Sequence, residues 1–486
     1  MSEVETELFG HPRRQHVLGL LGYFTKNLYV MVKSFWPVAA GLAFSGEVML
    51  YASLIVSVLL GLVVLSAVLE YLFFKFHLSG DQMVVHRGLW KKERLVIPFD
   101  RIQAVHLQQS AWQQLFGLTG LRVDTAGGSG SELDFRALKK IEAIELRSIL
   151  TGVTQKQTQG ESDRPLMVLD MLKLFKVGLT QNHLRNGAIA LGALVTVFEP
   201  LNRMIEAWLE SLPVWTGFVI SLFGFLLIIP GVILFVFLAV LASLVTAVIS
   251  YYKMRVDLEG DELSLESGLL KRNEFRIPLH KIQLLVWKST WLRRQLQLET
   301  LQIHQAKAQA ESGLGALALN IPGLEHDQSQ RILEAVFPRW NLNRVEQFKP
   351  VKHMRYRLFA AALLPLIPLF VVGGMGLVNL MIAVLWILFR WYSTGRKYES
   401  IKATSNEAVL VVKSGWWFRK RVALQWHQLQ RVSFHQNMFH KRRGIAHVGL
   451  HTAAGSQTLR FLPEADAHRI VNYSLYCIEN HKGSWM

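Results

Sequence analysis

Residues 77–103 read HLSGDQMVVHRGLWKKERLVIPFDRIQ, and residues 257–283 read DLEGDELSLESGLLKRNEFRIPLHKIQ. The two stretches align without a gap and share ten of 27 positions, including a Gly, an Ile-Pro and an Ile-Gln. Residues 404–430, TSNEAVLVVKSGWWFRKRVALQWHQLQ, keep the same frame with more changes, since Gln425 replaces the proline. Self-similarity of this kind indicates one structural unit used three times, and the copies are called repeats one, two and three.

Each repeat has the pattern of a β-hairpin followed by further strands. A short run of apolar residues stops at Gly88, Gly268 or Gly415, where a turn needs a positive φ. A basic turn, a return strand and a third strand that begins at the Ile-Gln pair follow. Two more strands flank a polar Gly/Ala/Ser-rich hairpin. The pattern predicts five to seven antiparallel strands per repeat, arranged as a small barrel or a bent sandwich.

A helix is expected to close each repeat, over residues 137–152, 323–337 and 463–480. Apolar residues recur there at roughly helical spacing and predict one apolar face. In the first and third repeats these residues are Ile141, Ile144, Leu150, Ile470, Tyr473 and Cys477.

This order of hairpin, strands and closing helix resembles the pleckstrin-homology (PH) fold. Ile97-Pro98 with Arg101-Ile102-Gln103, and Ile277-Pro278 with Lys281-Ile282-Gln283, are similar to the type-2 bacterial PH domain of YdbS/YdbT-like membrane proteins. The resemblance covers nearly the whole chain. It implies a membrane-tethered PH-like module without an established catalytic activity. It also implies a hetero-complex with a short single-module PH membrane protein, and the sequence leaves a homo-oligomer open.

Apolar stretches precede the repeats in three pairs. They are residues 28–45 and 48–74, a run from 186 to 197 followed by 215–250, and 358–372 and 377–389. A helix needs about 20 apolar residues to cross a hydrocarbon core of ~30 Å. The 358–372 stretch is short and contains Pro365 and Pro368.

Charge placement predicts the topology. Lys and Arg flank every pair on the side of the repeats. The connector within the first pair carries Glu47, the connector within the second carries both acidic and basic residues, Glu199 among them, and the connector within the third carries no charge. Because Lys and Arg gather on the cytoplasmic side, the repeats and both termini are expected in the cytoplasm of a bacterial inner-membrane protein. An even number of crossings per pair favours one long helix over residues 215–250. The acidic N-terminus and the long first run predict an uncleaved anchor.

The predicted fold class is membrane α-helical hairpins plus α+β or mainly-β modules. Three repeats of a transmembrane helix pair are each followed by a PH-like small β-barrel with a C-terminal helix. The expected boundaries are an N-terminal cytoplasmic segment 1–27; hairpins 28–76, 184–254 and 358–395; PH-like modules 77–155, 255–340 and 396–486; and linkers 156–183 and 341–357.

Composition excludes several classes of protein. Of 486 residues, 51% are hydrophobic, which excludes a disordered chain. The formal net charge is +17, from 53 Lys+Arg against 36 Asp+Glu, but the charge is spread over helix flanks and turns, so nucleic acid is not expected as a partner. The single cysteine, Cys477, excludes an intrachain disulfide.

A search for catalytic or metal-binding patterns finds none with supporting context. His447 and His451 lie four apart without a paired carboxylate, and Gly127–Gly130 lacks the Gly-Lys-Ser/Thr of a phosphate loop. We therefore expect no enzyme, no cofactor and no metal.

The basic turns carry the sharpest functional signal. Lys and Arg near an anionic leaflet contribute about 1 kcal/mol each, and Trp favours the headgroup interface. The predicted binding residues are Trp90, Lys91, Lys92, Arg94, Lys271, Arg272, Trp416, Trp417, Arg419, Lys420 and Arg421. The alternative for these turns is a solvated surface that serves only topology and solubility.

The predicted function is a non-enzymatic scaffold at the inner membrane, in envelope maintenance or stress, that binds anionic lipid headgroups or a protein partner. The alternative is a device that translocates lipid or peptide through the six helices. Few polar residues accompany those helices, and a polar groove lined by Asn379 or Glu70 would support such a path. Glu70 and Arg390 lie near helix ends, where snorkelling to the interface is expected.

Overall fold

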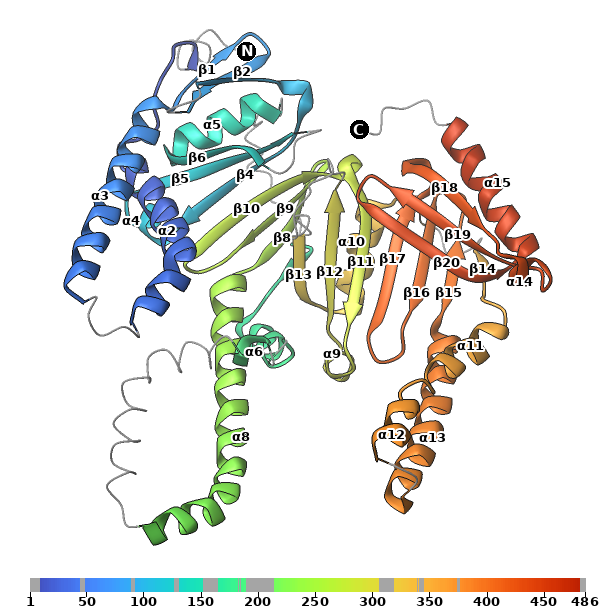
Figure 1. Cartoon of the computed structure of the whole chain (residues 1–486). Helices are drawn as coiled ribbons and strands as arrows, with labels where there is room; N and C mark the ends of the chain where they lie inside the picture. The colour runs from blue at the N-terminus through green and yellow to red at the C-terminus, as the bar shows by residue number, and fades with distance from the viewer. Residues whose placement is uncertain are drawn as a thin grey trace. The chain divides into compact units, whose positions relative to one another are not determined.

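Every repeat folds into hairpin strands, further strands and a closing helix in the predicted order (Figure 1). The computed structural model describes residues 9–43, 49–88, 92–125, 131–151, 165–181, 183, 185–188, 214–305, 319–338, 340, 345–373 and 376–480. The chain forms two compact units. The first contains repeat one with Glu262–Ile277 of repeat two, and the second contains the rest of repeat two with repeat three.

Repeat one begins with the helices α2 (Gly19–Ala43) and α3 (Met49–Phe73), which pack against each other. Its later elements are β1 (Lys75–Ser79), β2 (Gln82–Arg87), β3 (Glu93–Pro98), η1 (Phe99–Arg101), β4 (Ile102–Ser110), α4 (Ala111–Leu115), β5 (Leu118–Thr125), β6 (Ser131–Lys139) and α5 (Lys140–Thr151). A core of apolar side chains from the strands and α5, with Phe76 and Phe135 at its centre, holds them together.

Repeat two follows the same order. Its elements are β7 (Met167–Val168), α6 (Met171–Leu179), α8 (Val214–Tyr251), β8 (Arg255–Glu259), β9 (Glu262–Ser267), β10 (Lys271–Pro278), η2 (Leu279–Lys281), β11 (Ile282–Ser289), α9 (Trp291–Gln295), β12 (Glu299–Gln305), β13 (Leu319–Leu324) and α10 (His326–Val336). The turn at Gly268 has φ +109°, and a Cβ there would lie 2.0 Å from the carbonyl oxygen of Lys271. Glycine is therefore required at this position.

Repeat three has the same succession of strands. Its elements are β14 (Glu346–Phe348), α11 (His353–Ala361), α12 (Leu366–Gly373), α13 (Leu377–Ser400), β15 (Lys402–Ser405), β16 (Val409–Ser414), β17 (Arg419–Gln425), η3 (Trp426–Gln428), β18 (Leu429–His435), α14 (Met438–Lys441), β19 (Ile445–Thr452), β20 (Gly455–Pro463) and α15 (Glu464–Asn480). Although Gln425 replaces the proline, η3 still turns the chain from β17 into β18.

Strands of neighbouring repeats share sheets, which the sequence did not predict. β10 of repeat two pairs antiparallel with β4 of repeat one, with Arg272 opposite Gln109. β17 of repeat three pairs antiparallel with β11 of repeat two, with Arg419 opposite Ser289. The β4–β10 pairing is called the first junction and the β11–β17 pairing the second junction. Helix plus β-sheet architecture is confirmed. A closed barrel within each repeat is not, because one edge of each of these strands pairs with a strand of another repeat.

The closing helices bury the expected kind of face, with one error at the residue level. Ile470 is buried, and Cys477 packs against the core of repeat three. In α5 the buried face contains Leu146 and Leu150, whereas Ile141 is 80% exposed. The prediction for Ile141 was wrong because the buried face of α5 is formed by Ala143, Leu146, Arg147 and Leu150, and Ile141 lies on the opposite side of the helix.

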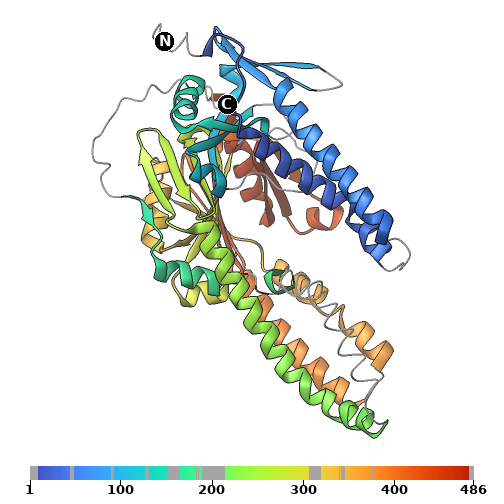
Figure 2. The same cartoon turned by 90° about the vertical axis from the view of Figure 1, so that its left-hand side faces the viewer.

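Four segments of the described residues are long and apolar enough to span a membrane: Leu54–Phe73, Val232–Tyr251, His353–Val371 and Leu377–Ser400. Most of the expected helix from residue 186 lies outside the described residues. α8 is one continuous helix of 38 residues, as the parity argument favoured. In the second unit, α8 and α13 run away from the strands in the same direction (Figures 1 and 2).

The first member of the short third pair is not one continuous helix. The chain leaves the helical conformation between α11 and α12, next to Pro365, which has no N–H to donate. The Nε1 of Trp386 donates to the carbonyl oxygen of Ala362 at this break, at 2.9 Å. A backbone acceptor is thereby satisfied inside a segment where water is scarce.

Candidate functional site

The basic turns of repeats one and two lie at or near strand starts. Trp90 and Lys91 fall outside the described residues, while Lys92 and Arg94 are exposed at the beginning of β3. Lys271 and Arg272 begin β10 at the first junction. Arg272 forms an exposed ion pair with Glu266 at 2.7 Å, and burial lowers the pKa of Lys271. The described residues of these two turns line neither the cavity at the β16–β17 turn nor the one beside Trp426.

The three cations of the third turn have different roles. Arg419 and Lys420 line a cavity, whereas Arg421 does not. Arg421 is paired with Glu299 at 3.1 Å, and its guanidinium lies 4.4 Å from the ring centroid of Trp287. Arg421 therefore stabilises the second junction and is not a free binding group.

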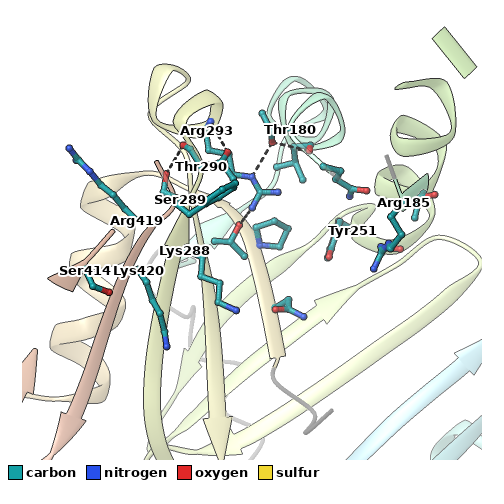
Figure 3. Close-up of a pocket in the computed structure, with 18 residues that line it drawn as sticks. Thr180, Arg185, Tyr251, Lys288, Ser289, Thr290, Arg293, Ser414, Arg419 and Lys420 are labelled. Atoms are coloured by element: carbon teal, nitrogen blue, oxygen red, sulfur yellow. Dashed lines mark hydrogen bonds between the residues drawn. The ribbon is translucent and has the colours of Figure 1, made fainter. Parts of the chain in front are cut away.

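The cavity has a volume of about 740 Å³ and is built by elements of the second unit (Figure 3). Its lining comes from α6, the end of α8, β11, α9, β12, β13 and the β16–β17 turn. The cationic lining residues are Arg185, Lys288, Arg293, Arg419 and Lys420, and none of the 18 lining residues is an Asp or Glu. This set of side chains favours an anion.

Lys288 and Lys420 are direct partners across the second junction. They extend the same way from neighbouring strands in Figure 3, whereas Arg419 points away from Lys420. Burial and the charge of Lys420 lower the pKa of Lys288. Like charges directly opposite each other destabilise a sheet. At the first junction the aligned positions are the neutral pair Gln108 and Asn273, so the lysine pair is not a requirement of the junction.

Arg293 is held in place beside the lysines. Thr290 caps the short helix α9 (Trp291–Gln295), and its Oγ1 accepts a hydrogen bond from the Arg293 backbone N–H at 3.3 Å. The guanidinium donates through Nε to Thr180 Oγ1 at 3.1 Å and through another nitrogen to Thr300 Oγ1. Burial lowers the pKa of Arg293, but a guanidinium stays protonated in proteins. Two hydroxyls thus fix a permanent positive charge in the cavity wall.

Aromatic side chains gather beside the cavity. Trp417 stacks on Trp291 with ring centroids 5.9 Å apart, and Trp416 meets Tyr392 of α13 edge-on at 5.5 Å. Trp417 is 49% exposed and Phe418 is 68% exposed. Tyr392 belongs to the candidate membrane-spanning segment Leu377–Ser400. These aromatic side chains are therefore expected close to the membrane.

Polar residues singled out from the sequence have structural partners. Glu70 accepts from Lys26 and Asn27, both at 3.4 Å, and Arg390 lies over the ring of Trp386. His447 Nδ1 accepts from the backbone N–H of Phe461 at 2.8 Å. Among the residues that the structure describes, no group of three or more His, Cys, Asp or Glu could hold a metal.

Sequence reasoning named Arg419 and Lys420, which line the cavity, but did not name Lys288 and Arg293, which line it too. Both missed residues follow the Ile-Gln pair of repeat two, in the stretch KIQLLVWKSTWLRR. A lysine at the end of an otherwise apolar strand was a weak signal. Its meaning depends on the pairing of β11 with β17, and that pairing is not visible in either repeat alone.

Comparison with known proteins agrees with the repeated architecture. The sequence profile of the family described as "Bacterial PH domain" matches residues 20–152, 218–339 and 359–476, which together are most of the chain. The chain is also 23% identical over 451 residues to the UPF0699 transmembrane protein YdbT of Bacillus subtilis (strain 168), covering 88% of this chain and 90% of that relative. Three profile matches, each spanning a membrane-helix segment and the strands that follow it, assign the chain to the bacterial PH domain family of transmembrane proteins.

Proposed function

We propose that this membrane protein binds the phosphate of an anionic lipid headgroup in the cavity formed by Lys288, Arg293 and Lys420, and acts as a non-enzymatic scaffold. The observation that carries the proposal is the pairing of two lysines across a strand junction, next to a fixed guanidinium, in a cavity whose 18 described lining residues include no carboxylate. A bound phosphate would offset the repulsion between the lysines and accept hydrogen bonds from all three side chains.

The position of the cavity favours a lipid over a soluble anion. Thr246, Ser250 and Tyr251 line it, and they belong to the last turns of the candidate span Val232–Tyr251. The exposed Trp417 and Phe418 lie beside it, and aromatic rings favour the headgroup region. A headgroup held at this depth has its phosphate near the cations while its acyl chains remain along α8.

The size of the effect follows from the number of cations. Each Lys or Arg near an anionic surface contributes about 1 kcal/mol, and removal of two should weaken binding roughly tenfold or more. Lys288 and Lys420 are themselves exposed, so lysines elsewhere should matter less because they lack the neighbouring cations of this cavity, and salt screens charges that lie farther from it.

A lipid-selectivity measurement on the full chain tests the proposal. The protein is reconstituted in phosphatidylcholine vesicles with trace spin-labelled phosphatidylglycerol or phosphatidylcholine, and the motionally restricted fraction of each label is recorded. Wild type should prefer phosphatidylglycerol, and the Lys288→Ala/Lys420→Ala variant should lose most of that preference.

The matched control is Lys139→Ala/Lys140→Ala, which removes the same charge from exposed positions of repeat one. This variant should keep the wild-type preference. An equal loss in both double variants would mean that only net charge matters and would contradict the proposal. Inorganic phosphate is added in a parallel series. If millimolar phosphate abolishes the preference, the cavity binds free phosphate instead of a headgroup.

We also propose that the repeats and both termini lie in the cytoplasm, so that the cavity faces the inner leaflet. The support is the placement of Lys and Arg beside the apolar segments. Reporters fused after Val153, Pro338 or Met486 should all be cytoplasmic. An external result at any one of these positions would overturn the orientation.

A further inference from the structure

Each of the two junctions between repeats uses the same pair of strand edges. The strand after the Ile-Gln pair of one repeat, β4 or β11, accepts the return strand of the next repeat, β10 or β17. Alignment of the repeats on the Ile-Gln pair shows that the register is also the same. Arg272 opposite Gln109 in the first junction corresponds to Arg419 opposite Ser289 in the second.

Two edges of this kind have no partner strand within the described residues. β3 of repeat one is an edge of the sheet β1-β2-β3, and β18 of repeat three is an edge of the sheet β18-β19-β20. β3 has the position of β10 and β17, and β18 has the position of β4 and β11. The chain therefore presents one half of a junction at each end of its series of repeats.

Burial shows what pairing does to these strands. All but one of the eight residues of β11 are buried, whereas Leu429 is the one buried residue among the seven of β18. Val96 of β3 is 40% exposed, while Ala423 at the aligned position of β17 is 0% exposed. Unpaired strand edges of this length are templates for another strand.

We propose that β3 of a second copy of this chain pairs with β18, which repeats the internal junctions between molecules. The internal register places Glu93 opposite His435, Arg94 opposite Phe434 and Val96 opposite Val432. The second of these pairs repeats the contact of Arg421 with the ring of Trp287. Because the two surfaces differ, the contact is head-to-tail and generates a ring or a chain of copies.

The short helix after each junction strand supports the same conclusion. Gln114 of α4 donates to the carbonyl oxygens of Leu269 and Leu270 at 3.3 and 3.4 Å, and Arg294 of α9 donates to that of Trp416 at 2.9 Å. Both side chains thus hold the hairpin turn of the next repeat. The aligned residue of α14 is Lys441, which is exposed and is again a donor.

Disulfide trapping between two differently tagged copies tests the pairing. In a Cys477→Ser background, one copy carries His435→Cys and the other Glu93→Cys, and both positions are exposed. The purified full-length chains are mixed, reconstituted in vesicles and oxidised. In the control, Gln82→Cys replaces Glu93→Cys; Gln82 is an exposed residue of β2, away from the edge strand. The yield of linked dimer should be at least several-fold higher with Glu93→Cys than with this control. Equal cross-linking of the two pairs would overturn the proposal.

Two further arms keep the result decisive. A single chain that carries both His435→Cys and Glu93→Cys should also yield products larger than one chain; a product linked only within one chain would overturn pairing with a second copy. Val96→Lys should lower the oligomer mass measured by light scattering in detergent, whereas Gln82→Lys, which adds the same charge off the edge, should leave it unchanged. An unchanged mass for Val96→Lys would also contradict the proposal.

Discussion

At the residue scale, Lys288 and Lys420 are the like-charged pair among the partners of the second junction. Their side chains extend the same way from neighbouring strands (Figure 3), and burial together with the charge of Lys420 lowers the pKa of Lys288. The basic turn alone was enough to name Arg419 and Lys420 as candidate residues, and both line the cavity. Lys288 could not be predicted, because its partner, Lys420, comes from another repeat. No local sequence motif indicates which strands of two repeats pair with each other.

The lowered pKa of Lys288 predicts a pH dependence of anion binding. An amine with a lowered pKa loses its proton at a lower pH than an exposed lysine, so the preference for phosphatidylglycerol should weaken as pH rises into the alkaline range. Lys288→Arg should retain the preference to higher pH, since a guanidinium does not titrate there. The spin-label measurement as a function of pH checks this expectation; identical profiles for both proteins would contradict it.

Glu274 gives a second prediction at this scale. It accepts from Arg147 at 2.5 Å and from Arg276 at 3.3 Å; burial would raise the pKa of Glu274, but the charge of Arg147 holds it below the usual value. Glu274→Gln leaves the buried guanidinium of Arg147 without its carboxylate and should destabilise the first junction by roughly 1–3 kcal/mol.

Hydrogen exchange of the β10 amides measures this loss. The matched control is Glu266→Gln in the same hairpin, which removes the exposed partner of Arg272 and should change exchange little. Equal acceleration in the two variants would show that the Arg147 contact has no special role.

At the element scale, the first hairpin of each repeat was the most predictable part of the fold. Gly88, Gly268 and Gly415 all have positive φ, as the stop of each apolar run indicated. Strand order and closing helices also followed from local patterns. The two prolines were noted in a stretch that is short for a membrane span, but the break between α11 and α12 was not predicted. The hydrogen bond from Trp386 that satisfies Ala362 was not predicted either, because it joins residues 24 apart.

Gly415→Ala should destabilise the turn that carries Trp416 and Trp417. Its φ is +91°, and a Cβ would lie 1.9 Å from the carbonyl oxygen of Phe418, so a cost of about 1–3 kcal/mol is expected. Thermal unfolding of the full chain in detergent measures it. Gly80→Ala is the control, since its φ is +58° and no atom lies within 4 Å of the added Cβ. An effect no larger than that of the control would contradict the steric account.

At the scale of the whole molecule, the repeats are not independent domains. The sequence pattern presented them as three self-contained modules, because each contains every strand of one unit. Sheet sharing is a property of edges, and edges have no composition signal as clear as the alternation that marks a strand. The count of three was therefore predictable, while the continuity between repeats was not.

A single repeat without its neighbours should expose the strand edges that are paired with other repeats in the full chain. Residues 255–340 expressed alone would lack both the partner of β10 and that of β11, and should self-associate. Light scattering of residues 255–340 in detergent checks this; a well-behaved monomer of this piece would contradict the importance of the junctions.

The central claim is that Lys288 and Lys420 hold a lipid phosphate, and amine footprinting tests it most directly. The full chain is reconstituted in phosphatidylcholine or in mixtures with phosphatidylglycerol and treated with an amine-reactive reagent, and modification rates are read by mass spectrometry. Phosphatidylglycerol should slow the modification of Lys288 and Lys420 several-fold. The modification of exposed Lys140 should change only as much as the negative charge of the vesicle surface changes the local reactivity of any exposed lysine. Equal slowing at all three lysines, or no slowing at the pair, would contradict the claim.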